Sequence, residues 1–74
     1  MAGVGDSSSG MININTAGIT ELDRLPGIGP ALAERIIQYR NDHGAFVKPE
    51  DLQKVSGIGA TTYEKMASRV SVGP

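Results

Sequence analysis

The feature that most constrains this chain is an internal repeat with a thirty-residue period. The segment LPGIGPALAERI, residues 25–36, recurs in altered form as VSGIGATTYEKM at residues 55–66. Coinciding glycines alone would be weak support, because the chain contains ten of them. The same shift also pairs apolar and charged positions, namely Leu22 with Leu52, Leu25 with Val55, Glu34 with Glu64, Arg35 with Lys65 and Ile36 with Met66. The chain is therefore a duplicated unit, and both copies should share one local structure.

Each unit predicts a short helix, a tight turn and a longer helix. In the first unit Gly18 is an acceptable N-cap for a helix over 19–24. Pro26 ends that helix because it lacks an amide donor and restricts the residue before it. Pro30 suits the first turn of the next helix, which should run to about residue 41, with Gly44 as its left-handed cap.

The second unit opens at Pro49, and its final helix should cover about residues 60–69. Tyr63, Met66, Ala67 and Val70 form the expected apolar side of that helix. The MININT stretch before the first unit alternates apolar and polar residues. This pattern also fits a short strand, but no partner strand is evident, so we favour an extended lead-in.

Composition indicates one small domain with an aliphatic core. A chain of 74 residues buries only about 60% of its unfolded surface, and no cysteine is present to add disulfides or thiolate metal ligands. Seven basic and eight acidic side chains give a net charge of −1, which offers no bulk attraction to nucleic acid. Residues 1–11 resemble a flexible linker or a cloning remnant. Residues 12–72 form the expected domain, with units over about 18–44 and 48–72.

The two Gly-Ile-Gly turns are the candidate binding elements. Glycine permits positive φ and lets another group approach the backbone closely. Each turn leads into a helix start, whose first amides lack intrahelical partners and attract anions. A purely structural corner explains one such turn equally well. Two copies favour a two-point contact with a ligand whose phosphates recur, as they do along a nucleic acid.

The segment LPGIGPALAERI resembles the helix-hairpin-helix motif at Leu25, Gly27, Ile28, Gly29, Ala33 and Ile36. In the second copy Tyr63 stands where that motif usually has a small alanine. The lead-in ININTAGITELDRLPGIG and the connector IIQYRNDHGAFVKPEDLQKVSGIG are similar to the duplicated domain of the ComEA family of bacterial competence DNA receptors. This resemblance covers about residues 12–72. Gly18 and Ala31 depart from the polar residues common in that family.

The resemblance implies an all-α fold of about four to five short helices, with two tandem motifs related by a pseudo-twofold axis. It implies non-sequence-specific binding to the phosphates of double-stranded DNA during competence, across the minor groove, with no enzymatic activity and no cofactor. Other uptake proteins are further conceivable partners, and no small-molecule substrate is expected. By the same resemblance the location is extracytoplasmic, with a membrane tether in the full-length protein; otherwise it is cytoplasmic. No membrane span or signal sequence is evident in this chain.

The candidate phosphate-binding residues follow from that resemblance and from the turns. Backbone amides are expected from one hairpin at Gly27, Ile28 and Gly29, and from the other at Gly57, Ile58 and Gly59. Auxiliary contacts are expected from the side chains of Thr61, Thr62, Lys65, Lys48 and Lys54. For the threonines, local capping of the backbone is an equally good interpretation. Arg24, Arg35, Arg40 and Arg69 read as solvated or paired surface residues.

Two other functions compete with DNA uptake. The same fold can serve as a protein-interaction module, which the neutral charge, Ala31 and Tyr63 favour, or as an accessory domain of a larger DNA-repair nuclease or helicase. A metal site at His43 and Asp42 lacks further ligands at useful spacing. Catalysis on a flipped base would need a larger chain than this one to enclose the base.

Overall fold

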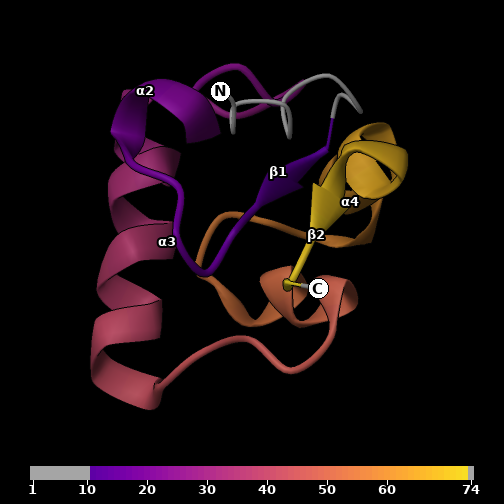
Figure 1. Ribbon diagram of the computed structural model, residues 1–74. Helices are drawn as coiled ribbons and strands as arrows, with labels where there is room; N and C mark the ends of the chain where they lie inside the picture. Colours follow the sequence, from indigo (N-terminus) through magenta and orange to yellow (C-terminus); the bar gives the residue numbers. More distant parts are fainter. Residues whose placement is uncertain (1–10, 74) are drawn as a thin grey trace, which may run out of the picture.

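The computed structural model describes residues 11–73, which form a mostly helical fold closed by one pair of short strands (Figure 1). The predicted linker over residues 1–11 lies outside the described residues except for Met11. The elements in chain order are β1 (Ile12–Asn13), α2 (Ile19–Leu22), α3 (Pro30–His43), the 3₁₀ helix η1 (Pro49–Lys54), α4 (Ala60–Met66), the 3₁₀ helix η2 (Ala67–Arg69) and β2 (Val70–Ser71). No helix within residues 11–73 is long and apolar enough to cross a membrane.

The longest helix, α3, begins where its sequence predicts and ends at the predicted glycine cap. Pro30 is its first residue, and its missing amide would have had no intrahelical partner at that position. Gly44 follows its last residue with φ of 92° and donates its amide to the Arg40 carbonyl at 3.0 Å. A residue with a Cβ would be strained at this φ, so the glycine ends the helix two residues beyond the expected position.

The shorter helices differ in detail from the sequence-based expectation. The first ends at Leu22 rather than residue 24, and the opening helix of the second unit, η1, has 3₁₀ rather than α geometry. The final helix is α-helical only to Met66 and tightens into η2 over Ala67–Arg69. Segments of four to seven residues gain little from α-helical hydrogen bonding, so tertiary packing decides their exact geometry.

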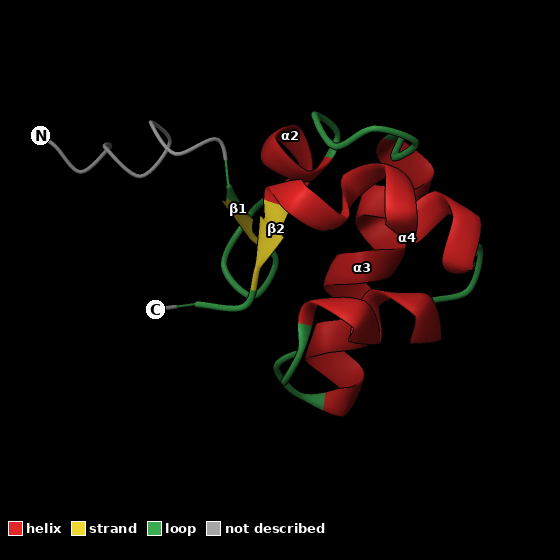
Figure 2. Cartoon of the chain, turned by 90° about the vertical axis from the view of Figure 1, so that its right-hand side faces the viewer, coloured by secondary structure: helices red, strands yellow, loops and turns green. Residues whose placement is uncertain are grey.

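The interpretation of MININT as an unpaired lead-in is wrong, because part of it forms a strand. Ile12–Asn13 pairs in parallel with Val70–Ser71, Ile12 opposite Val70 and Asn13 opposite Ser71. The Ile14 amide extends the contact by donating to the Ser71 carbonyl at 2.9 Å. Figures 1 and 2 show the two strands side by side, with the long helix α3 away from them. The pair thus joins the two ends of the described chain.

One side chain, Asn15, fastens three distant segments beside this strand pair. Its Oδ1 accepts the Phe46 amide at 2.7 Å, and its Nδ2 donates to the carbonyls of Phe46 at 3.0 Å and Val72 at 2.9 Å. Nearby, Arg40 donates from Nη1 to the Ile14 carbonyl at 2.8 Å. These bonds satisfy backbone groups of the connector and both chain ends that regular structure leaves unpaired.

The core is aliphatic, as composition predicts, and the repeat is visible in it. Four pairs of residues thirty positions apart are buried in both copies: Leu22 and Leu52, Leu25 and Val55, Ile28 and Ile58, Ile36 and Met66. Phe46 is the one aromatic residue in the buried cluster of the described chain. No polar or charged residue within the described range is buried. Equivalent residues of the two units therefore contribute to one continuous core.

Candidate nucleic-acid interface

The two Gly-Ile-Gly turns have nearly the same backbone geometry. We call residues 25–30 hairpin 1 and residues 55–60 hairpin 2. In hairpin 1 the Ile28 amide donates to the Leu25 carbonyl, and in hairpin 2 the Ile58 amide donates to the Val55 carbonyl, both at 3.0 Å. Despite its less regular sequence, hairpin 2 closes in the same way as hairpin 1.

The first glycine of each hairpin is required by the fold itself. Gly27 has φ of 83° and Gly57 has φ of 96°, values that L-residues with a Cβ rarely adopt. A Cβ on Gly27 would lie 3.4 Å from Thr62 Cγ2, in ordinary contact. A Cβ on Gly57 would lie 2.7 Å from Leu32 Cδ2, closer than side chains tolerate. Backbone conformation therefore accounts for Gly27, and backbone conformation together with internal packing accounts for Gly57.

The second glycine of each hairpin has no such internal reason. Gly29 has φ of −106° and ψ of −175°, and Gly59 has φ of −99° and ψ of −173°, which is extended backbone open to any residue. A Cβ at either position would meet nothing within 4 Å. Each glycine precedes a helix as its N-cap, yet no side chain caps either helix. The backbone at Gly29 and Gly59 is thus bare toward open space.

Both hairpins leave backbone amides without a partner in the protein. In hairpin 1 and the start of α3 these are the amides of Gly27, Gly29, Ala31 and Leu32, since Pro26 and Pro30 have none. The corresponding amides of the second unit belong to Ser56, Gly57, Gly59, Ala60, Thr61 and Thr62. The second unit therefore presents two more donors, because Ser56 and Ala60 stand where the first unit has Pro26 and Pro30.

The amides of Ile28 and Ile58 need a correction to their expected role. Both already donate inside their turns, and both side chains are buried. An N–H engaged in this way is not a free donor for a phosphate oxygen. These isoleucines anchor the turns to the core, while the neighbouring glycines and helix-start residues carry the unengaged amides.

The predicted auxiliary side chains lie in different surroundings. Thr61 and Lys65 are exposed on α4, and Thr62 is half-buried with its methyl group against hairpin 1. Lys48 is exposed at the start of η1, where its backbone amide donates to Asp51 Oδ2 at 3.3 Å. Lys54 Nζ lies 3.7 Å from Asp51 Oδ1, so its charge is partly offset.

The Asp51 carboxyl has a pKa below its ordinary value. Desolvation raises this pKa, but the amide of Lys48 and the positive charge of Lys54 outweigh it and favour the carboxylate. Asp51 thus stays ionised beside both lysines at neutral pH. Within residues 11–73 the Lys48 ammonium group forms no ion pair, so Lys48 is the more available cation of the two.

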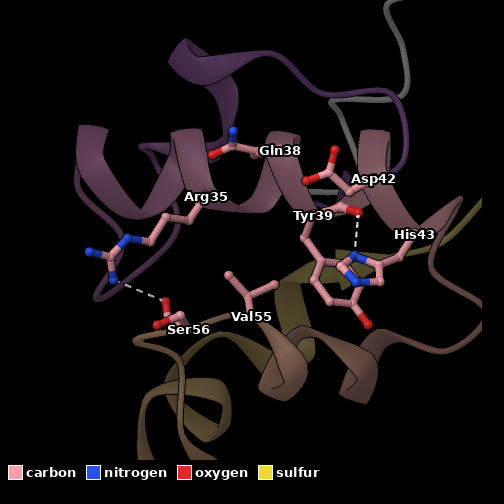
Figure 3. A pocket seen from close by; sticks show the side chains of 7 residues that line it. All are labelled: Arg35, Gln38, Tyr39, Asp42, His43, Val55 and Ser56. Carbon is pink, nitrogen blue, oxygen red and sulfur yellow. Dashed lines mark hydrogen bonds between the residues drawn. The ribbon is translucent and has the colours of Figure 1, made fainter.

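Sequence reasoning assigned no binding role to Arg35, which the structure brings to hairpin 2. Its Nη1 donates to the Ser56 carbonyl at 3.2 Å (Figure 3) and lies 3.0 Å from the position of a Cβ on Gly57. The signal was present in the repeat, because the thirty-residue shift aligns Arg35 with Lys65, a predicted contact residue.

Arg35 lies at one end of an open groove of about 380 Å³ between α3 and the second unit. Its lining residues are Arg35, Gln38, Tyr39, Asp42, His43, Val55 and Ser56. His43 stacks on Tyr39 with ring centroids 4.2 Å apart, and its Nδ1 is 3.2 Å from the Tyr39 carbonyl oxygen. No group of three potential metal ligands occurs within residues 11–73, and His43 serves here to cap and pack the end of α3.

Comparison with known proteins now identifies the fold. Residues 7–71 match the family described as "Helix-hairpin-helix motif". The chain belongs to the helix-hairpin-helix family. It is 48% identical over 62 residues to ComE operon protein 1 of Bacillus subtilis (strain 168), covering 84% of this chain and 30% of that protein. This likeness makes it a ComEA-like helix-hairpin-helix domain, as the sequence motifs indicate.

Other relatives differ widely in length. An uncharacterised protein of Haemophilus influenzae is 48% identical over 63 residues, which are 56% of its length. The human endonuclease/exonuclease/phosphatase family domain-containing protein 1 is 48% identical over 61 residues, which are 11% of its length. This chain thus spans between about a tenth and just over half of these relatives. The similarity concerns the helix-hairpin-helix domain alone.

Proposed function

We propose that this domain binds double-stranded DNA without sequence preference, by docking the two hairpins on backbone phosphates, and that it serves DNA uptake during competence. Membership of the helix-hairpin-helix family and the 48% identity to ComE operon protein 1 support this function. A contact made by backbone amides reads phosphates rather than bases, which accounts for binding without sequence preference.

The observation that carries this proposal is the pair of bare glycines, Gly29 and Gly59. Serine, aspartate or asparagine would cap these helices at least as well as glycine does. Neither backbone conformation nor packing demands glycine at either position. A phosphate approaching the free amides does demand it, because any Cβ or capping oxygen would occupy part of the same space.

We further propose that the two units pack around a pseudo-twofold axis, so that both hairpins can contact one duplex. The supporting contacts are reciprocal: Gly27 of hairpin 1 meets Thr62, while Gly57 of hairpin 2 meets Leu32. Thirty residues separate Gly27 from Gly57 and also Leu32 from Thr62. Such exchange of equivalent contacts is expected when two copies face each other.

The proposal also assigns a role in DNA binding to the other predicted site residues. Residues 12–72 act as the domain. The amides of Gly27, Gly29, Gly57 and Gly59 form the docking surface, with Thr61, Thr62, Lys65 and Lys48 as side-chain contacts. Lys54 contributes less than Lys48, because Asp51 offsets its charge. The domain itself is non-catalytic.

A role beside a larger enzyme is a second candidate, because endonuclease/exonuclease/phosphatase family domain-containing protein 1 shares this domain at 48% identity. Only 11% of that protein is matched, so any catalytic part it has lies elsewhere. In such a protein the domain would still bind DNA. The two candidates therefore differ in what the domain is attached to, not in how it binds.

Exchanging the bare glycines for serine tests phosphate docking without disturbing the fold. In Gly29→Ser and Gly59→Ser the hydroxyl can cap its own helix, so stability should stay equal or rise by about 0.3 kcal/mol. The same hydroxyl competes with phosphate for the free amides. We expect each variant to bind a fluorescent duplex about tenfold more weakly, because one charge-assisted contact is lost.

Gly18→Ser is the matched control for this experiment. Gly18 is also an uncapped N-cap glycine in extended conformation with no neighbour within 4 Å of its Cβ position, but it lies outside both hairpins. Its serine variant should bind DNA as the wild type does. Unchanged DNA binding in folded Gly29→Ser and Gly59→Ser would refute docking at the hairpins. Loss of binding to a protein partner instead would favour an interaction module.

A further inference from the structure

Arg35 links the two units, since it lies on α3 in the first unit and contacts hairpin 2 in the second. Its hydrogen bond to the Ser56 carbonyl uses one of the five N–H donors of the guanidinium group. The side chain is exposed, and no carboxylate among residues 11–73 forms an ion pair with it. Figure 3 shows its other terminal nitrogen turned away from the side chains that line the groove.

This arrangement suits a side chain that is held in place and still able to bind an anion. The Ser56 carbonyl fixes one edge of the planar guanidinium group beside Gly57. The other edge keeps parallel N–H donors and a full positive charge, the geometry that binds phosphate with two hydrogen bonds. A lysine ammonium group has no planar set of donors. One hydrogen bond to a carbonyl therefore could not orient two further donors toward a phosphate.

Resting on the proposed DNA binding, we propose that Arg35 is a phosphate-contacting residue that the first unit supplies to hairpin 2, and that Lys65 of the second unit serves hairpin 1. Each hairpin then combines backbone amides of its own unit with a cation from the other. Because Arg35 is exposed and its second terminal nitrogen is turned away from the groove, a phosphate can approach the outer edge of the guanidinium group (Figure 3).

The assignment of Lys65 follows from the contacts of α3. Leu32 and Arg35, three residues apart on one helix face, both reach Gly57. Thr62 is the equivalent of Leu32, and it contacts Gly27. Lys65 follows Thr62 by three residues on α4, so it lies on the face of α4 that is turned to hairpin 1.

The dependence of DNA affinity on salt separates a phosphate contact from a structural clamp. Arg35→Gln should weaken duplex binding about tenfold and reduce the slope of log K against log salt by about 0.9, as for one lost cation–phosphate contact. Arg35→Lys keeps the charge and should keep most of the slope. Arg40→Gln is the control, because Arg40 also donates to a backbone carbonyl but lies at the far end of α3.

Arg40→Gln should lower stability and leave the slope unchanged, with all binding measured well below the unfolding temperature. An unchanged slope in Arg35→Gln, alongside normal wild-type binding, overturns the phosphate contact and leaves Arg35 as a clamp. If the wild type itself binds no duplex, the proposed function fails instead. The two failures are therefore distinguishable.

A double-mutant cycle tests which hairpin Arg35 serves. Combined with Gly59→Ser in hairpin 2, Arg35→Gln should add little further loss, because both changes disable one phosphate contact. Combined with Gly29→Ser in hairpin 1, the fold-losses should multiply to within a factor of about two. Lys65→Gln should give the opposite pattern. The proposal that each unit supplies a cation to the other unit's hairpin is contradicted if Arg35→Gln is non-additive with Gly29→Ser, and Lys65→Gln with Gly59→Ser.

Discussion

At the scale of single residues, the fold requires the first glycine of each Gly-Ile-Gly turn but does not require the second. Gly27 and Gly57 have positive φ and face the other unit, so the fold requires them. Gly29 and Gly59 have ordinary extended backbone and face open space. Replacing the first glycines would confuse loss of folding with loss of binding. The second glycines are the positions where function can be tested separately.

Alanine at the first glycines should reveal how tightly the units meet. Gly27→Ala introduces backbone strain of about 1–2 kcal/mol, with its Cβ in ordinary contact with Thr62. Gly57→Ala introduces the same strain and also pushes a Cβ against Leu32 Cδ2, so we expect a loss of about 2–4 kcal/mol. Urea denaturation followed by circular dichroism measures both. Equal losses would mean that Leu32 moves aside without cost.

At the scale of elements, the two-residue strands owe their position to side-chain hydrogen bonds as much as to their own pairing. A strand pair this short is not stable alone. Asn15 follows β1 and binds the backbone of Phe46 and Val72, which ties the connector and the segment after β2 to the start of the domain. The helices are held by the core, whereas the chain ends depend on this one amide in addition to their own pairing.

Asn15→Ala should therefore destabilise the whole domain by about 2–4 kcal/mol, because three backbone partners lose their bonds in a partly buried place. Asn15→Asp should also destabilise it, since a carboxylate cannot donate to two carbonyls. The exposed Asn41 on α3 offers Asn41→Ala as a control with little effect. Thermal unfolding measures all three. A stability loss no larger than that of Asn41→Ala would show that water replaces the Asn15 bonds.

The elements also show what the sequence could and could not predict. The repeat, both hairpins, α3 and its Gly44 cap were predictable, because prolines, glycines and apolar spacing determine them locally. The strand pair was missed because the alternation in MININT is short and its partner residues lie at the other end of the chain. The 3₁₀ geometry of η1 and the engaged amides of Ile28 and Ile58 depend on packing. The symmetric packing of the units stays a prediction.

At the scale of the whole molecule, binding to DNA has to proceed without help from net charge. The chain carries a net charge of −1, and removing the ten undescribed N-terminal residues, which include Asp6, leaves seven basic and seven acidic side chains. A neutral domain gains no long-range attraction to a polyanion. Affinity must come from the short-range contacts of two hairpins, whose combined effect exceeds that of either alone when both reach one duplex.

This balance predicts a weak, sequence-independent affinity with a modest salt dependence. We expect dissociation constants of about 1–100 µM at physiological salt, the range of non-specific binding. If Arg35, Lys65 and Lys48 are the contacting cations, the slope of log K against log salt should be about −2 to −3, at about −0.9 per phosphate. Fluorescence titrations with two unrelated duplexes of equal length should agree within about twofold. A slope near −6 would require many more cation contacts than this surface offers, and a strong preference for one duplex would require base contacts. Either result would place the binding surface elsewhere than on the two hairpins.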